Sequence, residues 1–150
     1  MKIRMTINGK LHETKVSPSD MLIDVVRKLG YTGTKRGCDT TNCGLCTVLV
    51  DDKPILSCSY PAYRADEKAV TTIEGVQAEA TILGGFLAME GSDQCGFCTP
   101  GLVMNTIAMK KELGYPDDES IKRYLAGNLC RCTGYEGQMR AIRKYLEVTK

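Results

Sequence analysis

The chain has 150 residues, and its 20 Lys and Arg against 18 Asp and Glu leave a formal net charge of only +2. Because charges of both signs are interspersed along the chain, neither a basic surface for nucleic acid nor an acidic tail is expected. No apolar stretch is long enough to insert into a membrane, and a single histidine, His12, leaves little means for acid–base catalysis.

The N-terminal part is predicted to begin with a β-hairpin followed by a helix. Residues 2–8 alternate apolar and polar side chains, and residues 8–9 (Asn-Gly) are a strong turn signal before a second strand over 11–16. Residues 17–20 (Ser-Pro-Ser-Asp) are typical of a helix start. Apolar residues then recur at helical spacing as far as Gly30.

A second hairpin and a further strand are expected next. Residues 47–50 and 55–57 flank a turn of sequence Asp-Asp-Lys-Pro at 51–54, and residues 70–73 supply the further strand. A helix laid across such a sheet makes a small α+β domain of the ferredoxin kind.

After Gly75 the pattern changes from strands to helices, so a domain boundary is expected near residues 75–79. Four segments of roughly 8–15 residues predict a compact helical bundle. Their inward residues are expected to be Ile82, Leu83, Phe86 and Leu87; Leu102, Val103, Thr106, Ile107 and Leu113; Ile121, Tyr124 and Leu125; and Met139, Ile142, Tyr145 and Leu146.

The eight cysteines form two groups of four, one on each side of that boundary. The first group reads C-x4-C-x2-C with a lone cysteine further on, and it comprises Cys38, Cys43, Cys46 and Cys58. The second reads C-x2-C followed much later by C-x-C, and it comprises Cys95, Cys98, Cys130 and Cys132. Four thiolates suit a [2Fe–2S] or [4Fe–4S] cluster, and the first spacing is that of plant-type [2Fe–2S] ferredoxins. Two such clusters indicate a route for single electrons.

Other uses of eight cysteines fit less well. A disulfide framework is typical of short secreted chains, whereas the start of this chain has no apolar core of a signal peptide, which favours the cytoplasm. Structural zinc fits the second group tolerably but fits the first poorly, because Cys58 has no near partner in sequence. A Rieske centre needs two histidines, and the chain has one.

The residues around the cysteines suit an anionic cluster. Gly37 and Gly44 allow the first loop to curl and to point N–H groups inward, and Lys35 and Arg36 are candidate cations beside it. In the second group, Cys98 runs into Thr-Pro and Cys132 precedes the last helix. Two helix N-termini are therefore expected to meet at the second cluster.

Five segments together closely resemble the small iron–sulfur subunit of the molybdenum hydroxylases, the family of xanthine dehydrogenase, carbon monoxide dehydrogenase, aldehyde oxidoreductase and nicotinate dehydrogenase. They are GCDTTNCGLCTV at 37–48, Ser57-Cys58, TTIEG at 71–75, QCGFCTPG at 94–101 and GNLCRCTGY at 127–135. They occur in the family's order and cover both expected domains. The last two segments are very specific.

The resemblance implies an α+β protein with two [2Fe–2S] clusters. Residues 1–76 would form an N-terminal β-grasp, plant-type ferredoxin-like domain, and residues 77–150 a C-terminal four-helix bundle. The second cluster would lie next to a molybdopterin cofactor (the cytosine dinucleotide or a similar form), with Gln94 and Cys132 on the pterin side. The first cluster would face FAD.

The resemblance also implies partners and a role. A large molybdopterin-binding subunit and a medium FAD-binding subunit would complete a heterotrimer or a dimer of heterotrimers. The chain would pass single electrons from molybdopterin to FAD during oxidative hydroxylation of a purine, N-heterocycle or aldehyde, with a xanthine dehydrogenase-like complex favoured. It would have no substrate-binding active site of its own. A free iron–sulfur carrier is the competing hypothesis, although such carriers are expected to be strongly acidic.

Four places depart from the family pattern without removing a cysteine, the first being residues 40–42 (Thr-Thr-Asn) in the middle of the first cysteine loop. Leu45 replaces the usual small residue between Cys43 and Cys46, and residues 85–87 differ from the family's Gln-rich helix start. Residues 137–139 (Gly-Gln-Met) replace the usual apolar run after Gly-Tyr. These departures prevent the transfer of any particular relative's substrate.

Overall fold

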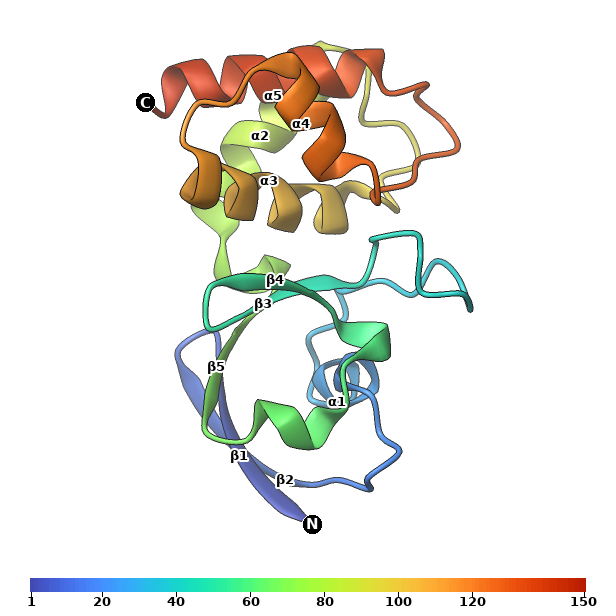
Figure 1. The fold of residues 1–150 in the computed structure, drawn as a ribbon, viewed down its shortest axis with the longest axis vertical. Helices are drawn as coiled ribbons and strands as arrows, with labels where there is room; N and C mark the ends of the chain where they lie inside the picture. The colour runs from blue at the N-terminus through green and yellow to red at the C-terminus, as the bar shows by residue number, and fades with distance from the viewer.

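A computed structural model describes all 150 residues as a five-stranded mixed sheet and five α-helices (Figure 1). The chain therefore has the mixed α+β composition that the sequence predicts. The elements are β1 (Lys2–Ile7), β2 (Lys10–Lys15), α1 (Leu22–Lys28), β3 (Thr47–Val50), β4 (Lys53–Leu56), β5 (Lys68–Thr71), α2 (Gln77–Met89), α3 (Thr99–Leu113), α4 (Asp118–Leu125) and α5 (Glu136–Val148).

The sheet has the strand order β2-β1-β5-β3-β4, in which only β1 and β5 run parallel. The predicted Asn8-Gly9 turn joins β1 to β2, and both residues have positive φ (51° and 81°), as tight hairpin turns require. The alternation of β1 is confirmed, because its apolar residues are buried together with the apolar face of α1. This shared core contains Ile3, Met5, Ile7, Leu22, Val25 and Val26.

Several boundaries differ from the sequence prediction, among them that of β5, which spans Lys68–Thr71 where the sequence predicts residues 70–73. The turn after β3 contains only Asp51 and Asp52, both at positive φ, so Pro54 lies inside β4. A proline is tolerated there because β4 is an edge strand and Pro lacks only the N–H. Helix α1 begins at Leu22 without a side-chain cap, because the Asp20 carboxylate accepts from the Ser17 N–H instead.

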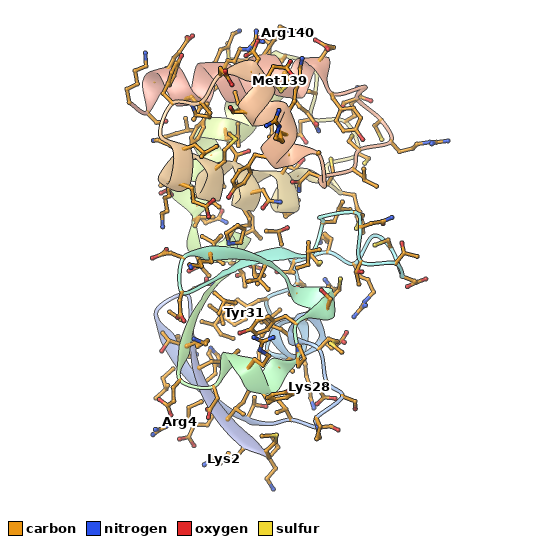
Figure 2. The ribbon with its side chains drawn as sticks, in the orientation of Figure 1. Lys2, Arg4, Lys28, Tyr31, Met139 and Arg140 are labelled. Atoms are coloured by element: carbon orange, nitrogen blue, oxygen red, sulfur yellow. The ribbon has the colours of Figure 1, made fainter.

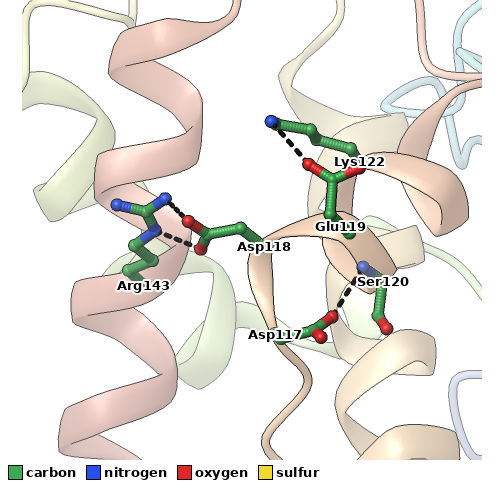
Figure 3. Close-up of polar contacts among 6 residues, drawn as sticks. All are labelled: Asp117, Asp118, Glu119, Ser120, Lys122 and Arg143. Carbon is green, nitrogen blue, oxygen red and sulfur yellow. Dashed lines mark hydrogen bonds and ion pairs between the residues drawn. The ribbon is translucent and has the colours of Figure 1, made fainter.

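The helices after residue 76 pack around a second apolar core. It contains Leu83 and Leu87 of α2 together with residues of α3, α4 and α5. Asp117 caps α4 by accepting the Ser120 N–H at 2.8 Å, and an Asp118–Arg143 ion pair joins α4 to α5 (Figure 3). Four helices over the predicted segments are confirmed, but Ile82 and Leu113 are exposed rather than inward. No helix has both the length and the apolar character needed to cross a membrane.

Helix α3 lies against the sheet and joins the two cores. Met104 and Ala108 of α3 pack on Leu49 of β3, and all three are buried. Figure 1 shows α2 to α5 stacked on one side of the β3–β4 hairpin and α1 on the other, with the two chain ends at opposite ends of the molecule. In Figure 2, Lys2 and Arg4 accordingly lie far from Met139 and Arg140 of α5.

Candidate metal centre

The first cysteine group lies on a loop between α1 and β3 and on a single helical turn after β4. Cys43 and Cys46 are buried, while Cys38 and Cys58 are partly exposed. The four thiols come together as two pairs: the side chain of Cys38 interacts with that of Cys43, and that of Cys46 with that of Cys58. The fold therefore gives the lone Cys58 a sulfur partner that the sequence spacing did not reveal.

The backbone of this loop points its N–H groups at the sulfurs. N–H groups of Asn42, Cys43 and Thr40 contact the Cys38 sulfur, and the Asn42 contact contributes most to lowering the pKa of Cys38 to about 6. Burial raises the pKa of Cys43 and raises that of Cys58 to about 12. The inward N–H donors predicted for the loop are confirmed, and they favour a negatively charged occupant.

The two candidate cations differ in position. The Arg36 guanidinium pairs with Asp24 at 2.8 Å and also lies within electrostatic range of Cys58 and Cys46. The Lys35 ammonium donates instead to the Thr32 carbonyl oxygen. Of the pair, Arg36 is therefore the cation that favours negative charge on the first group.

The second cysteine group lies where α3 and α5 begin. Cys98 immediately precedes α3, which has Pro100 in its first turn, and the Cys130–Cys132 loop leads into α5. The thiols again form two pairs: the sulfurs of Cys95 and Cys132 are 3.6 Å apart, and the side chain of Cys98 interacts with that of Cys130.

Hydrogen-bond donors surround Cys98 and Cys130, the inner pair of the second group. Burial raises the pKa of Cys98 to about 12, and the Gln138 side-chain N–H donates to its sulfur at 3.7 Å. At Cys130, burial opposes ionisation, but the Thr133 hydroxyl at 3.2 Å and backbone N–H groups outweigh it, so its pKa is lowered. The outer pair, Cys95 and Cys132, is exposed.

The arrangement of each group fits a two-iron cluster. Two thiolates on one tetrahedral metal with bonds of about 2.3 Å lie roughly 3.7 Å apart, close to the 3.6 Å between Cys95 and Cys132. A two-iron cluster takes two such pairs, whereas one zinc ion takes all four thiolates at a single centre. The Cys95–Cys132 distance therefore suits two thiolates on one iron of such a cluster.

The two groups face each other across the junction between sheet and helices. A cavity of about 450 Å³ is lined by Cys38 and Cys43 and by all four cysteines of the second group. The backbone also connects them directly, because the Leu129 N–H donates to the Cys43 carbonyl oxygen at 2.9 Å. Figure 1 shows the loops that carry them on the same side of the molecule.

A buried polar network, which we call the polar bridge, consists of Thr47, Asn105 and Asn128. Asn105 donates to Asn128 at 2.6 Å and to Thr47 at 3.2 Å, while Asn128 donates to the Gly44 carbonyl oxygen at 3.3 Å. Gly44 has a φ of +75°, and a side chain there would collide with the Gly127 carbonyl oxygen. Sequence reasoning assigned no role to these asparagines, although Asn128 belongs to the quoted GNLCRCTGY segment.

Gln94 lies beside the exposed pair of the second group. Its side chain is exposed, and its one hydrogen bond is to the Gly91 carbonyl oxygen at 3.3 Å. Apolar surface adjoins that pair, since Phe97, Leu129 and Tyr135 line the same cavity as Cys95 and Cys132 and are all more than 40% exposed. The exposed thiols of Cys95 and Cys132 thus sit within a partly apolar surface.

Comparisons with known proteins find two families on the chain. A 2Fe-2S iron–sulfur cluster binding domain matches residues 5–83, and a [2Fe-2S] binding domain matches residues 72–143. The chain is 45% identical to a probable xanthine dehydrogenase subunit of Bacillus subtilis, over 93% of this chain and 82% of that protein.

Two further relatives match over nearly their whole lengths. The nicotinate dehydrogenase small FeS subunit of Eubacterium barkeri is 36% identical, over 97% of this chain and 94% of that protein. In the crystal structure of quinoline 2-oxidoreductase from Pseudomonas putida 86, one chain superposes with a TM-score of 0.90 at 37% identity. That superposition covers 99% of this chain and 94% of the other.

Proposed function

This chain belongs to the family of small iron–sulfur subunits of xanthine dehydrogenase and related molybdenum hydroxylases, and on that premise we propose that it carries single electrons from a molybdopterin site to FAD, both on partner subunits. The observation that carries the proposal is the arrangement of eight thiols as two groups of two pairs, six of which line one cavity between the groups. When bound, each [2Fe–2S] cluster takes up and releases one electron.

We assign the cluster ligands from the paired thiols. The first cluster takes one pair, Cys38 and Cys43, on one iron and the second pair, Cys46 and Cys58, on the other. The second cluster takes the pairs Cys95–Cys132 and Cys98–Cys130 in the same way. Residues 1–76 form a β-grasp domain around the first cluster, and residues 77–150 form a four-helix bundle around the second. Each part having its own apolar core supports this division.

The chain's own bonds provide a short connection between the two sites. Cys130 is covalently joined to Leu129, whose N–H donates to the carbonyl oxygen of Cys43. An electron path along these bonds thus crosses one hydrogen bond and no solvent-filled gap. Leu45, which is buried beside Cys43, helps to keep water from the first site.

The exposed surface around Cys95 and Cys132 is the proposed contact with the large, molybdopterin-binding subunit. Gln94 lies there with a free side-chain amide edge, and it would donate to the pterin. Exposed apolar residues nearby would be covered on assembly, as interface cores usually are. A medium FAD-binding subunit would then face the first site, completing a heterotrimer or a dimer of heterotrimers. We place the complex in the cytoplasm, because thiols that bind iron must stay reduced and the cytoplasm keeps thiols reduced.

The substrate would react on another subunit in this proposal, so the identity of the substrate rests on the family rather than on a pocket of this chain. A purine, an N-heterocycle or an aldehyde fits the family, with a xanthine dehydrogenase-like complex favoured. The 45% identity to the Bacillus subtilis protein supports that preference.

The test is anaerobic purification of the tagged chain with its partners, followed by metal, flavin and EPR analysis. We expect about four irons per chain, molybdenum and two larger subunits, with two distinct [2Fe–2S] signals after reduction. Iron without molybdenum or partners would indicate a free carrier instead. Zinc in place of iron would overturn the cluster assignment.

Ligand variants test which residues hold which cluster. Cys46→Ser is expected to abolish one EPR signal and Cys130→Ser the other, each leaving its companion signal intact. Loss of both signals from either single change, with the protein still folded, would contradict two independent sites.

A further inference from the structure

Gln138 is a buried amide in an otherwise apolar position. It lies in the first turn of α5, and it is only 5% exposed. A buried amide without partners costs roughly 1–3 kcal/mol, so its hydrogen bonds indicate why it is tolerated. Leu102 and Ile142 line the same cavity as Gln138 and offer no side-chain acceptor.

The partner of the Gln138 amide is a cysteine sulfur. Its Nε2 donates to the Cys98 Sγ at 3.7 Å, and this is the one side-chain N–H in the molecule that donates to a thiol. Cys98 is itself partly buried at the start of α3. The contact therefore lies on the inner side of the second cysteine group, away from solvent and from the exposed Cys95 and Cys132.

A hydrogen bond to a thiolate ligand acts on the redox balance of the metal it binds. Uptake of an electron adds negative charge to the iron and its sulfurs, and an N–H donor stabilises that added charge. The effect is larger in a buried site than in water, because solvent screens it less. The first group has no such side-chain donor, since the donors on Cys38 and Cys43 are backbone N–H groups.

We propose that Gln138 is a positioning residue that selectively raises the reduction potential of the second cluster by donating to Cys98. This inference rests on the proposed function, because it takes Cys98 as a cluster ligand. A higher potential at the second site holds the electron arriving from molybdopterin more firmly and reduces the driving force for its transfer to the first site.

The experiment is an EPR-monitored redox titration of the intact complex with Gln138→Met, which keeps the length of the side chain and removes the donor. Gln77→Met is the matched control, because Gln77 is exposed and donates only to the Ile73 carbonyl oxygen. In Gln138→Met we expect the equilibrium constant for reduction of the second cluster to fall about tenfold, which lowers its reduction potential by about 59 mV for one electron. The first cluster, the iron content and the control variant should not change.

Three outcomes would overturn the inference: an unchanged second potential, equal shifts at both clusters, or the same shift in the control. If Gln138→Met does not retain iron, a second experiment uses the wild-type complex instead. In it, the glutamine side-chain amides of this chain are labelled with ¹⁵N. We expect the EPR signal of the second cluster to show a magnetic coupling to the labelled nitrogen, and this coupling should persist in the Gln94→Ala variant. Absence of the coupling would refute the hydrogen bond from Gln138 to Cys98. Failure of the proposed function is distinguishable, because the wild type would then lack the two iron–sulfur signals.

Discussion

At the scale of single residues, the two cysteine groups differ in what supplies their hydrogen bonds. Backbone N–H groups of Asn42, Cys43 and Thr40 surround Cys38, and only a substitution by proline removes a backbone donor. In the second group, the side chains of Thr133 and Gln138 donate to Cys130 and Cys98. The second site is consequently the one whose properties point substitutions can adjust without rebuilding a loop.

Gln94 allows a prediction at the same scale. Its exposed side chain makes one hydrogen bond, at 3.3 Å to the Gly91 carbonyl oxygen, so Gln94→Ala should leave folding and iron content unchanged. Loss of a hydrogen bond of about 0.5–1.5 kcal/mol to the pterin should slow reduction of the clusters by substrate roughly two- to tenfold. Stopped-flow reduction measures this rate, with Gln77→Ala as control. Identical rates in wild type and Gln94→Ala would refute the assigned role.

At the scale of elements, α3 is the helix that both sites depend on. Its first turn follows Cys98, and Gly101 lies directly against the backbone of the first cysteine loop. A side chain at Gly101 would come within 2.5 Å of the Gly44 carbonyl oxygen. Further along, Met104 and Ala108 pack on Leu49 of the sheet. The position of α3 therefore sets the distance between the loop of Cys43 and the start of the bundle.

Gly101→Ala should consequently push the loop and helix apart. The atoms it would meet are backbone atoms that cannot rotate away, so we expect a loss of roughly 1–3 kcal/mol in unfolding free energy and altered magnetic coupling between the reduced clusters. The control is Gly84→Ala in α2, where nothing lies within 4 Å of the added carbon. That change should leave stability unchanged or raise it by about 0.5–1 kcal/mol. Denaturant unfolding and EPR check both, and equal stability of the two variants would contradict the close packing.

At the scale of the whole molecule, the sheet and the bundle are joined by polar contacts as well as by apolar ones. The polar bridge connects Thr47, Asn105 and Asn128, and the last of these holds the Gly44 carbonyl oxygen of the first loop. Beside it runs the Leu129 to Cys43 backbone hydrogen bond. Polar contacts depend on direction, so they fix how the two parts are oriented, which apolar packing alone does less strictly.

The polar bridge predicts coupling between its two asparagines. Asn105→Ala and Asn128→Ala should each cost about 1–3 kcal/mol, because each leaves buried polar partners unsatisfied. The double variant should cost less than the sum, with a coupling energy of at least about 0.5 kcal/mol. Unfolding experiments on the four proteins measure the cycle. Strict additivity would mean that the asparagines do not act together.

Much of the fold follows from local patterns that a sequence displays directly. The Asn8-Gly9 turn, the alternation of β1 and the four helices after residue 76 are each specified by neighbouring residues. Boundaries were less predictable where tertiary context overrides local preference. Pro54 resembles a turn residue but lies in an edge strand, and Ile82 fits the apolar face of α2 but is exposed.

The sequence by itself determined which eight residues carry thiols, how they divide into two groups, and the family to which the chain belongs, because spacing and residue type are local properties. Only the tertiary structure decided which thiols pair, since Cys95 meets Cys132 across 37 positions. It alone placed Gln138 on Cys98 and Asn128 on Gly44, across 40 and 84 positions. Such contacts arise from how the helices pack on the sheet, and no stretch of neighbouring residues encodes that packing.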